Sequence, residues 1–100
     1  MGKKYKVFLV DDSPMIRKHL RKFLETEDYI VQEADNGQDA LDKVENGYMP
    51  DICLFDIEMP FVNGRELTES FRKRKEFDNI PIIDKVNVHI NTVTGYNLDK

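Results

Sequence analysis

Three aspartates stand where two apolar segments of the sequence end. Asp11 and Asp12 follow residues 7–10 (VFLV), and Asp56 follows residues 52–55 (ICLF). A short unbroken apolar run between polar residues is typical of a strand buried on both faces of a parallel sheet. Open α/β sheets bind their ligands beyond the carboxyl ends of the strands. The sequence therefore predicts that these carboxylates contribute to one site.

The chemistry predicted for that site depends on how close the carboxylates lie. Strands one and three of a right-handed α/β sheet commonly lie side by side, which would bring the three aspartates together. Carboxylates a few ångströms apart repel one another, so they take up protons or bind a cation. Their hard oxygen atoms suit Mg²⁺, and the sequence has no His or Cys cluster for zinc. Such a cluster suits phosphoryl transfer with one carboxylate as the nucleophile.

The bulk properties predict one soluble domain. The chain has 100 residues, of which 40% are hydrophobic and 34% are charged. The net charge of -4 argues against nucleic acid as a partner. No apolar stretch is long enough to cross a membrane, and the amino terminus does not resemble a signal peptide, so we expect a cytoplasmic protein. The single cysteine, Cys53, is expected to be a core side chain.

The elements that would position the aspartates alternate along the chain. Ser13 as N-cap and Pro14 at the first helical position predict the start of the first helix. Gly47 supplies a stop for the second helix. The predicted strands are residues 4–10, 29–34, 52–55 and 80–83. The predicted helices run from Ser13-Pro14 to near Thr26, from Asn36-Gly37 to Gly47, and from Asn63-Gly64 to near Phe77.

The segment after the fourth strand has a different character. Apolar and polar residues alternate from Val86 onward, which is the pattern of a half-buried strand. A strand over residues 86–94 could return antiparallel to the fourth strand. A poorly ordered tail fits the same residues equally well.

Taken together, these segments resemble the receiver domain of response regulators in two-component signalling. The matching segments cover about residues 4–83 in order: VDDS, ADNGQDAL, DICLFDIEMP, the NG of FVNGREL, and IPII. The resemblance implies an α/β fold, a flavodoxin-like three-layer sandwich with a parallel sheet in the order 2-1-3-4. Residues 1–83 would form the receiver-like domain. Residues 84–100 would form a divergent segment in place of the usual last helix, strand and helix.

The resemblance also implies roles for individual residues. Asp56 would be the phosphoacceptor, modified by a histidine kinase, a phosphotransfer protein or a small phosphodonor. Asp11, Asp12 and Asp56 would hold Mg²⁺ together with the backbone carbonyl of Glu58. The chain would catalyse only its own phosphorylation and dephosphorylation, so we expect a signalling domain and not an enzyme acting on other substrates.

The match to the family is lost after Ile83. Similar receivers end the fourth strand with Thr or Ser and a small residue, and here the register places Val86 and Asn87. They also carry a later strand that ends in Lys-Pro, a pair that this sequence lacks. Thr94 is a candidate for the switch threonine, although it lies late in the register. Since the nucleophile and the metal ligands are present, we expect slow phosphorylation that is specific to Asp56.

Two other functions fit parts of the sequence. A shortened receiver could act as a phosphorylation-independent dimerisation or protein-binding module, because an exposed fourth strand needs to be covered. A second copy of the chain, or the strand over residues 86–94, could cover it. A magnesium-dependent phosphatase would use Asp56 as nucleophile and Glu58 as acid. The small size, the missing cap domain and the acid pair that precedes the nucleophile strand argue against a phosphatase.

Overall fold

The computed structural model describes residues 4–56 and 63–84. In these residues, parallel strands alternate with helices along the chain. The strands are β1 (Lys6–Val10), β2 (Ile30–Ala34), β3 (Ile52–Phe55) and β4 (Ile82–Asp84). The helices are α1 (Pro14–Thr26), α2 (Gly37–Glu45), α3 (Gly64–Arg72) and the 3-10 turn η1 (Lys75–Phe77). The sheet order β2-β1-β3-β4 confirms the predicted order.

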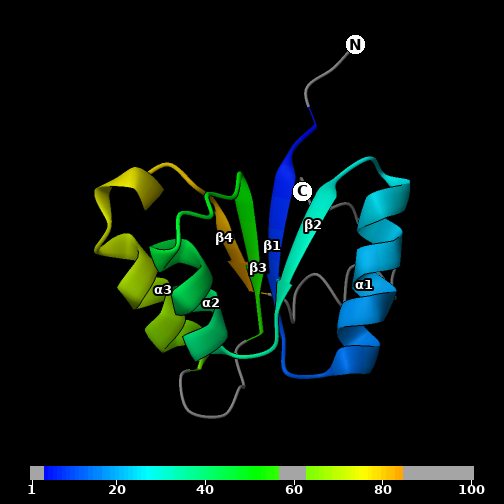
Figure 1. Ribbon diagram of the computed structural model, residues 1–100, viewed down its shortest axis with the longest axis horizontal. Coiled ribbons are helices and arrows are strands. Elements are labelled where there is room, and N and C mark those ends of the chain that lie inside the picture. The colour runs from blue at the N-terminus through cyan, green and yellow to red at the C-terminus, as the bar shows by residue number, and fades with distance from the viewer. Residues whose placement is uncertain (1–3, 57–62, 85–100) are drawn as a thin grey trace.

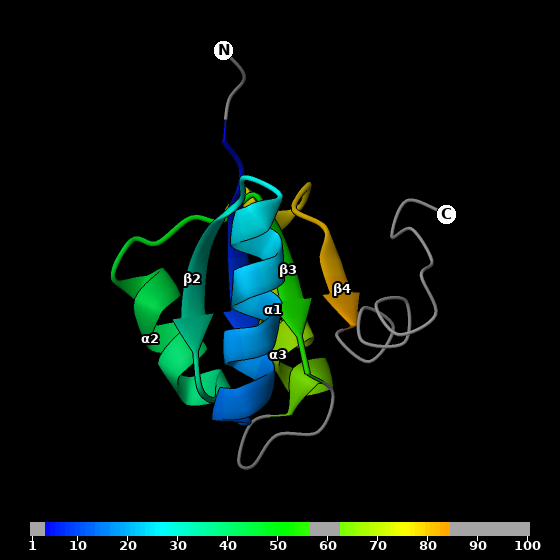
Figure 2. The same cartoon turned by 90° about the vertical axis from the view of Figure 1, so that its right-hand side faces the viewer.

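The helices cover both faces of the sheet. In Figure 1, α1 lies on one face, and α2 and α3 lie on the other. Figure 2 shows β2 and β4 at opposite edges, with β1 and β3 between them. Parallel strands need crossover helices, and helices on both faces explain why the central strands are apolar apart from Lys6 at the start of β1.

Alternation along the strands divides the core in two, because successive side chains of a strand point to opposite faces. The smaller cluster, the α1 core, contains Val7, Leu9, Leu20, Leu24, Val31 and Leu54. The larger cluster, the α2/α3 core, contains Phe8, Val10, Ala34, Ala40, Val44, Cys53, Phe55, Leu67, Phe71 and Phe77. Each apolar run predicted as a buried strand therefore supplies side chains to both clusters.

The helix starts follow the cap residues seen in the sequence. Ser13, Asn36 and Asn63 each accept a hydrogen bond from a backbone N–H of the first helical turn. These bonds satisfy donors that would otherwise lack a partner within the helix. Gly47, which was predicted to stop α2, has a φ of 103°, a conformation that favours glycine.

The predicted end of the third helix near Phe77 is wrong. The helix ends at Arg72, and Arg74 is extended with φ -94° and ψ 125° before η1 begins. A helix continued through the basic run 72–75 would have no apolar side chain to bury. The extended residue instead turns the chain so that Phe77 reaches the α2/α3 core, where its ring lies 4.7 Å from that of Phe71. Burial of the Phe77 ring therefore contributes more free energy than continuing the helix past Arg72 would.

Some predictions lie outside the described residues. The strand over residues 86–94 and the cover for the fourth strand are among them. The division of the chain into residues 1–83 and 84–100 likewise stays a prediction. None of the helices that the structure describes combines the length and the apolar character needed to cross a membrane.

The substitution Phe71→Ala should cost about 3–5 kcal/mol of the free energy of unfolding, because it removes a fully buried ring and leaves a cavity. The Phe71 ring contacts those of Phe8, Phe55 and Phe77. Urea denaturation measures the loss. Phe23→Ala, at a residue that is 45% exposed on α1, is the matched control and should cost below about 1 kcal/mol. Equal losses in the two variants would contradict this account of the core.

Candidate metal centre

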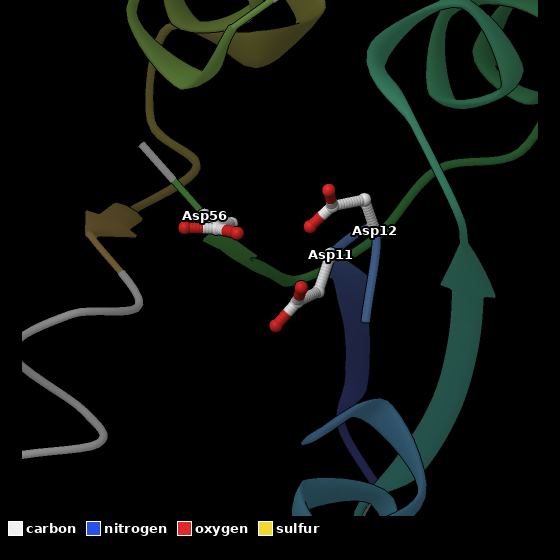
Figure 3. Close-up of side chains that lie close together, drawn as sticks. All are labelled: Asp11, Asp12 and Asp56. Atoms are coloured by element: carbon white, nitrogen blue, oxygen red, sulfur yellow. The ribbon is translucent and has the colours of Figure 1, made fainter. Parts of the chain in front are cut away.

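The three aspartates predicted to converge do so at one edge of the sheet. Figure 3 shows Asp11 and Asp12 just beyond β1 and Asp56 just beyond β3. One carboxylate oxygen from each of the three residues lies within 4.8 Å of the other two. The two strands are hydrogen-bonded neighbours with Val10 opposite Phe55, so the residues that follow them meet at the same level.

Asp11 is the one fully buried charged residue in the part of the chain that the structure describes. Its backbone N–H donates to the carbonyl of Ala34 at 3.1 Å, which extends the β1–β2 ladder past the end of the strand. Its Oδ1 accepts a hydrogen bond of 2.8 Å from the backbone N–H of Ser13. A buried carboxylate requires such donors, because desolvation penalises the charged form. The β1–α1 turn thus holds Asp11 in a fixed position.

The other two aspartates differ from Asp11 in exposure. Asp56 is partly buried, and its backbone N–H donates to the carbonyl of Val10 at 2.9 Å. Asp12 is exposed. Exposure within the site therefore increases from Asp11, which is buried, through Asp56 to Asp12. A reactant from solvent meets Asp12 and Asp56 first.

Behind the acidic turn lies a charged pair that the sequence analysis did not single out. Arg17 on α1 donates through Nε to Oε1 of Glu33 on β2 at 2.9 Å, and through Nη1 to the backbone carbonyl of Asp11 at 2.6 Å. Arg21 donates to the second Glu33 oxygen at 2.6 Å. Burial alone would raise the pKa of Glu33, but the hydrogen bonds from Arg21 and Arg17 outweigh it and leave that pKa below its ordinary value.

A signal for this pair was present in the sequence. Glu33 stands two residues after Val31, so strand alternation places both side chains on the face that α1 covers. A charged residue at such an inward position requires a partner of opposite charge. Arg17 and Arg21 are four residues apart and therefore share one face of α1.

Other residues singled out in the sequence fall in two groups. Glu58, Val86, Asn87 and Thr94 lie outside the described residues. Cys53 is a core side chain as predicted, with no exposed surface. Burial raises the pKa of its thiol to about 12, so the thiol stays protonated at neutral pH.

The donor set fits a hard divalent cation. It offers carboxylate oxygen atoms from three side chains at a separation that one ion can bridge. Mg²⁺ is bound in this way, by a few carboxylates with water in the remaining positions. The three negative charges also repel one another, which a bound cation relieves.

Comparison with known proteins supports the same fold class. Residues 7–93 match the family described as the response regulator receiver domain. The chain is 37% identical to the transcriptional regulatory protein ResD of Bacillus subtilis over 92 residues, or 91% of the chain and 37% of ResD. It is 44% identical to the chemotaxis protein CheY of Halobacterium salinarum over 72 residues, or 72% of the chain and 57% of CheY.

A solved structure adds to these relatives. The response regulator TrrA of Thermotoga maritima, solved in complex with Mg²⁺-BeF, matches with a TM-score of 0.69 and 26% identity. The match covers 91% of this chain and 97% of that one. The chain therefore belongs to the response regulator receiver domain family of two-component systems. It spans 37% of the length of ResD and 57% of the length of CheY.

Neutralising one carboxylate should stabilise the metal-free protein. Asp12→Asn removes like-charge repulsion, which at this spacing amounts to about 1 kcal/mol in a solvated setting. We expect a higher urea midpoint for the variant in the presence of a chelator. Mg²⁺ should then stabilise the wild type more than the variant. Asp42→Asn, on the exposed side of α2, is the control and should show neither effect; a gain of the same size there would refute the repulsion.

The lowered pKa of Glu33 predicts an acid-dependent loss of stability. The unfolded state binds a proton at Glu33 more readily than the folded state, so stability falls as the pH drops below the ordinary glutamate range. We expect Glu33→Gln to be less stable than the wild type at neutral pH and to lose less stability on acidification. Thermal unfolding from neutral to acidic pH measures both slopes. Parallel slopes would contradict the assignment.

Proposed function

We propose that this chain is a phosphoacceptor, in which Asp56 takes a phosphoryl group in a Mg²⁺-dependent reaction. The observation that carries the proposal is the convergence of the three carboxylates at the ends of β1 and β3. Membership of the receiver family supports it. The phosphodonor would be a histidine kinase, a phosphotransfer protein or a small phosphodonor.

The environments of the three carboxylates support Asp56 as the nucleophile. Asp11 has no exposed surface, and one of its oxygens already accepts the Ser13 N–H. Asp56 is partly exposed at the end of a central strand, so a phosphodonor from solvent can reach it. Asp12 is exposed and lies in the turn after β1, so it is better suited to a ligand role. The proposed nucleophile thus follows β3, and two of the proposed metal ligands, Asp11 and Asp12, follow β1.

The chain's own residues contribute position and charge. Asp11, Asp12 and Asp56 would hold Mg²⁺, with the Glu58 carbonyl proposed as a further ligand. Bound Mg²⁺ offsets the negative charge of the carboxylates and of the phosphoryl oxygens. An oxygen of Asp56 attacks phosphorus, the bond from phosphorus to the donor breaks, and the donor leaves with its electron pair. The product is an aspartyl phosphate. The hydrogen bond from the backbone N–H of Asp56 to the carbonyl of Val10 keeps the nucleophile in place.

We infer that catalysis by this chain is confined to Asp56. The proposed reaction consumes the chain's own side chain, and hydrolysis of the acyl phosphate restores it. The phosphorylated form would be read by a partner protein. Thr94 is kept as the proposed switch residue, and a homodimer is kept as a proposal for the assembly.

Incubation with Mg²⁺ and acetyl phosphate should give a single phosphoryl adduct, measured by intact mass. The adduct requires a nucleophile and a cation, so it should be absent from Asp56→Asn and absent in chelator. Asp42→Asn is the matched control, since it removes an acidic group on α2 away from the site, and it should be modified like the wild type. An adduct that persists on Asp56→Asn would overturn the proposed phosphoacceptor.

A further inference from the structure

Arg17 connects the acidic turn to β2. Its guanidinium bridges two acceptors, the Asp11 carbonyl oxygen at 2.6 Å and the Glu33 carboxylate at 2.9 Å. The Arg17 side chain is only 16% exposed. Guanidinium is planar and its donors point in fixed directions, so a bridge of this kind sets the relative positions of both acceptors.

The position of Arg17 is itself fixed from the other side. The second oxygen of Glu33 accepts from Arg21, and Arg21 donates through Nε to Glu25 at 2.9 Å. Hydrogen bonds thus link four charged side chains in a row that starts at the acidic turn: Arg17, Glu33, Arg21 and Glu25. Charged pairs of this kind contribute little net stability, because desolvation and lost side-chain freedom offset the attraction. Stability alone is therefore a weak reason for this arrangement.

The oxygen that Arg17 holds has a particular place in the backbone. It belongs to the peptide that joins Asp11 to Asp12, and rotation of that peptide would redirect the Cα–Cβ bond of Asp12. Asp11 is already fixed by its bonds to Ala34 and Ser13. Asp12 is exposed, and the orientation of the preceding peptide sets the direction in which its side chain leaves the backbone.

We propose that Arg17 is a positioning residue for the metal centre, which holds the Asp11–Asp12 peptide so that the Asp12 carboxylate stays beside Asp11 and Asp56. This inference rests on the proposed function, since it assumes that the three carboxylates bind a divalent cation. Glu33 acts one step further back by fixing Arg17. Neither residue touches the reacting atoms.

The sign of the effect separates positioning from simple electrostatics. Arg17 carries a positive charge near the site, and removal of that charge alone should strengthen cation binding. Loss of the hydrogen bond to the Asp11 carbonyl should weaken binding, because a ligand is no longer held in place. A fall in affinity after removal of Arg17 can therefore arise from position and not from charge.

The test is Mg²⁺ affinity of the full chain by isothermal titration calorimetry. Arg17→Met should lower the affinity by about tenfold, at the lower end of the range for groups that orient metal ligands. Arg17→Lys keeps the charge but reaches one acceptor, so its loss should be smaller. Arg21→Met is the matched control. It removes a charge and a bond to the same Glu33 while leaving the Arg17 bridge, and its affinity should stay within about twofold of wild type.

Two further readouts exclude a merely structural role. The Mg²⁺ concentration that gives half-maximal phosphorylation of Asp56 should rise for Arg17→Met, while the rate at saturating Mg²⁺ recovers to the wild-type value. The amide resonance of Asp12 should shift in Arg17→Met without metal, because the Asp11 carbonyl of the same peptide has lost its donor. Circular dichroism confirms that each variant is folded, and Arg17→Lys and Glu33→Gln provide the answer if Arg17→Met does not fold.

Two results would overturn the inference. Unchanged or tighter Mg²⁺ binding by folded Arg17→Met would show that the bridge does not position a ligand. Equal losses in Arg17→Met and Arg21→Met would show general loosening of the α1–β2 contact. Failure of the proposed function is distinct, because it appears in the wild type as absent Mg²⁺ binding and no adduct on Asp56.

Discussion

Mutual repulsion among three carboxylates is the constraint that the rest of the structure must meet. Their oxygens lie within 4.8 Å of one another, and Asp11 is buried. Such carboxylates stay close only where the backbone prevents them from moving apart. The β1–β2 ladder, the β1–β3 ladder and the cap of α1 each fix one side of the turn. The packing of the sheet therefore sets the electrostatics of the site.

The two-sided core makes this rigidity possible. Because β1 is buried on both faces, its end cannot shift without disturbing the α1 core and the α2/α3 core together. The aromatic side of the α2/α3 core, where Phe71 contacts three other rings, anchors β1 and β3 through Phe8 and Phe55. The packing of the strands thus fixes the positions of the side chains that follow them, and these side chains need few contacts of their own.

Much of this could be predicted from the sequence. The apolar runs before Asp11 and Asp56 specify buried parallel strands, and a central position for both strands places the acids together. Helix starts at Ser13, Asn36 and Asn63 follow from local hydrogen bonding that a short segment determines by itself.

Features that depend on tertiary packing were harder to predict. The end of α3 at Arg72 depends on the place that the Phe77 ring takes in the α2/α3 core. The basic residues between Phe71 and Phe77 do not indicate that place. The bridge from Arg17 to the Asp11 carbonyl depends on the spacing between α1 and β2, which residue patterns do not specify. Alternation along β2 does place Glu33 on the α1 face, so the contact between Glu33 and an arginine of α1 was predictable in principle.

The place of Glu33 on β2 also bears on how copies of this chain behave toward one another. Among the described residues β2 pairs with β1 alone, so one row of its backbone groups faces outward at the sheet edge. Open edges invite pairing with strands of other chains, and a charge in the middle of a short edge strand opposes it. Glu33 and its ion pairs with Arg17 and Arg21 place charged groups beside this edge. We therefore expect the charged side chains behind the acidic turn also to oppose aggregation along this edge.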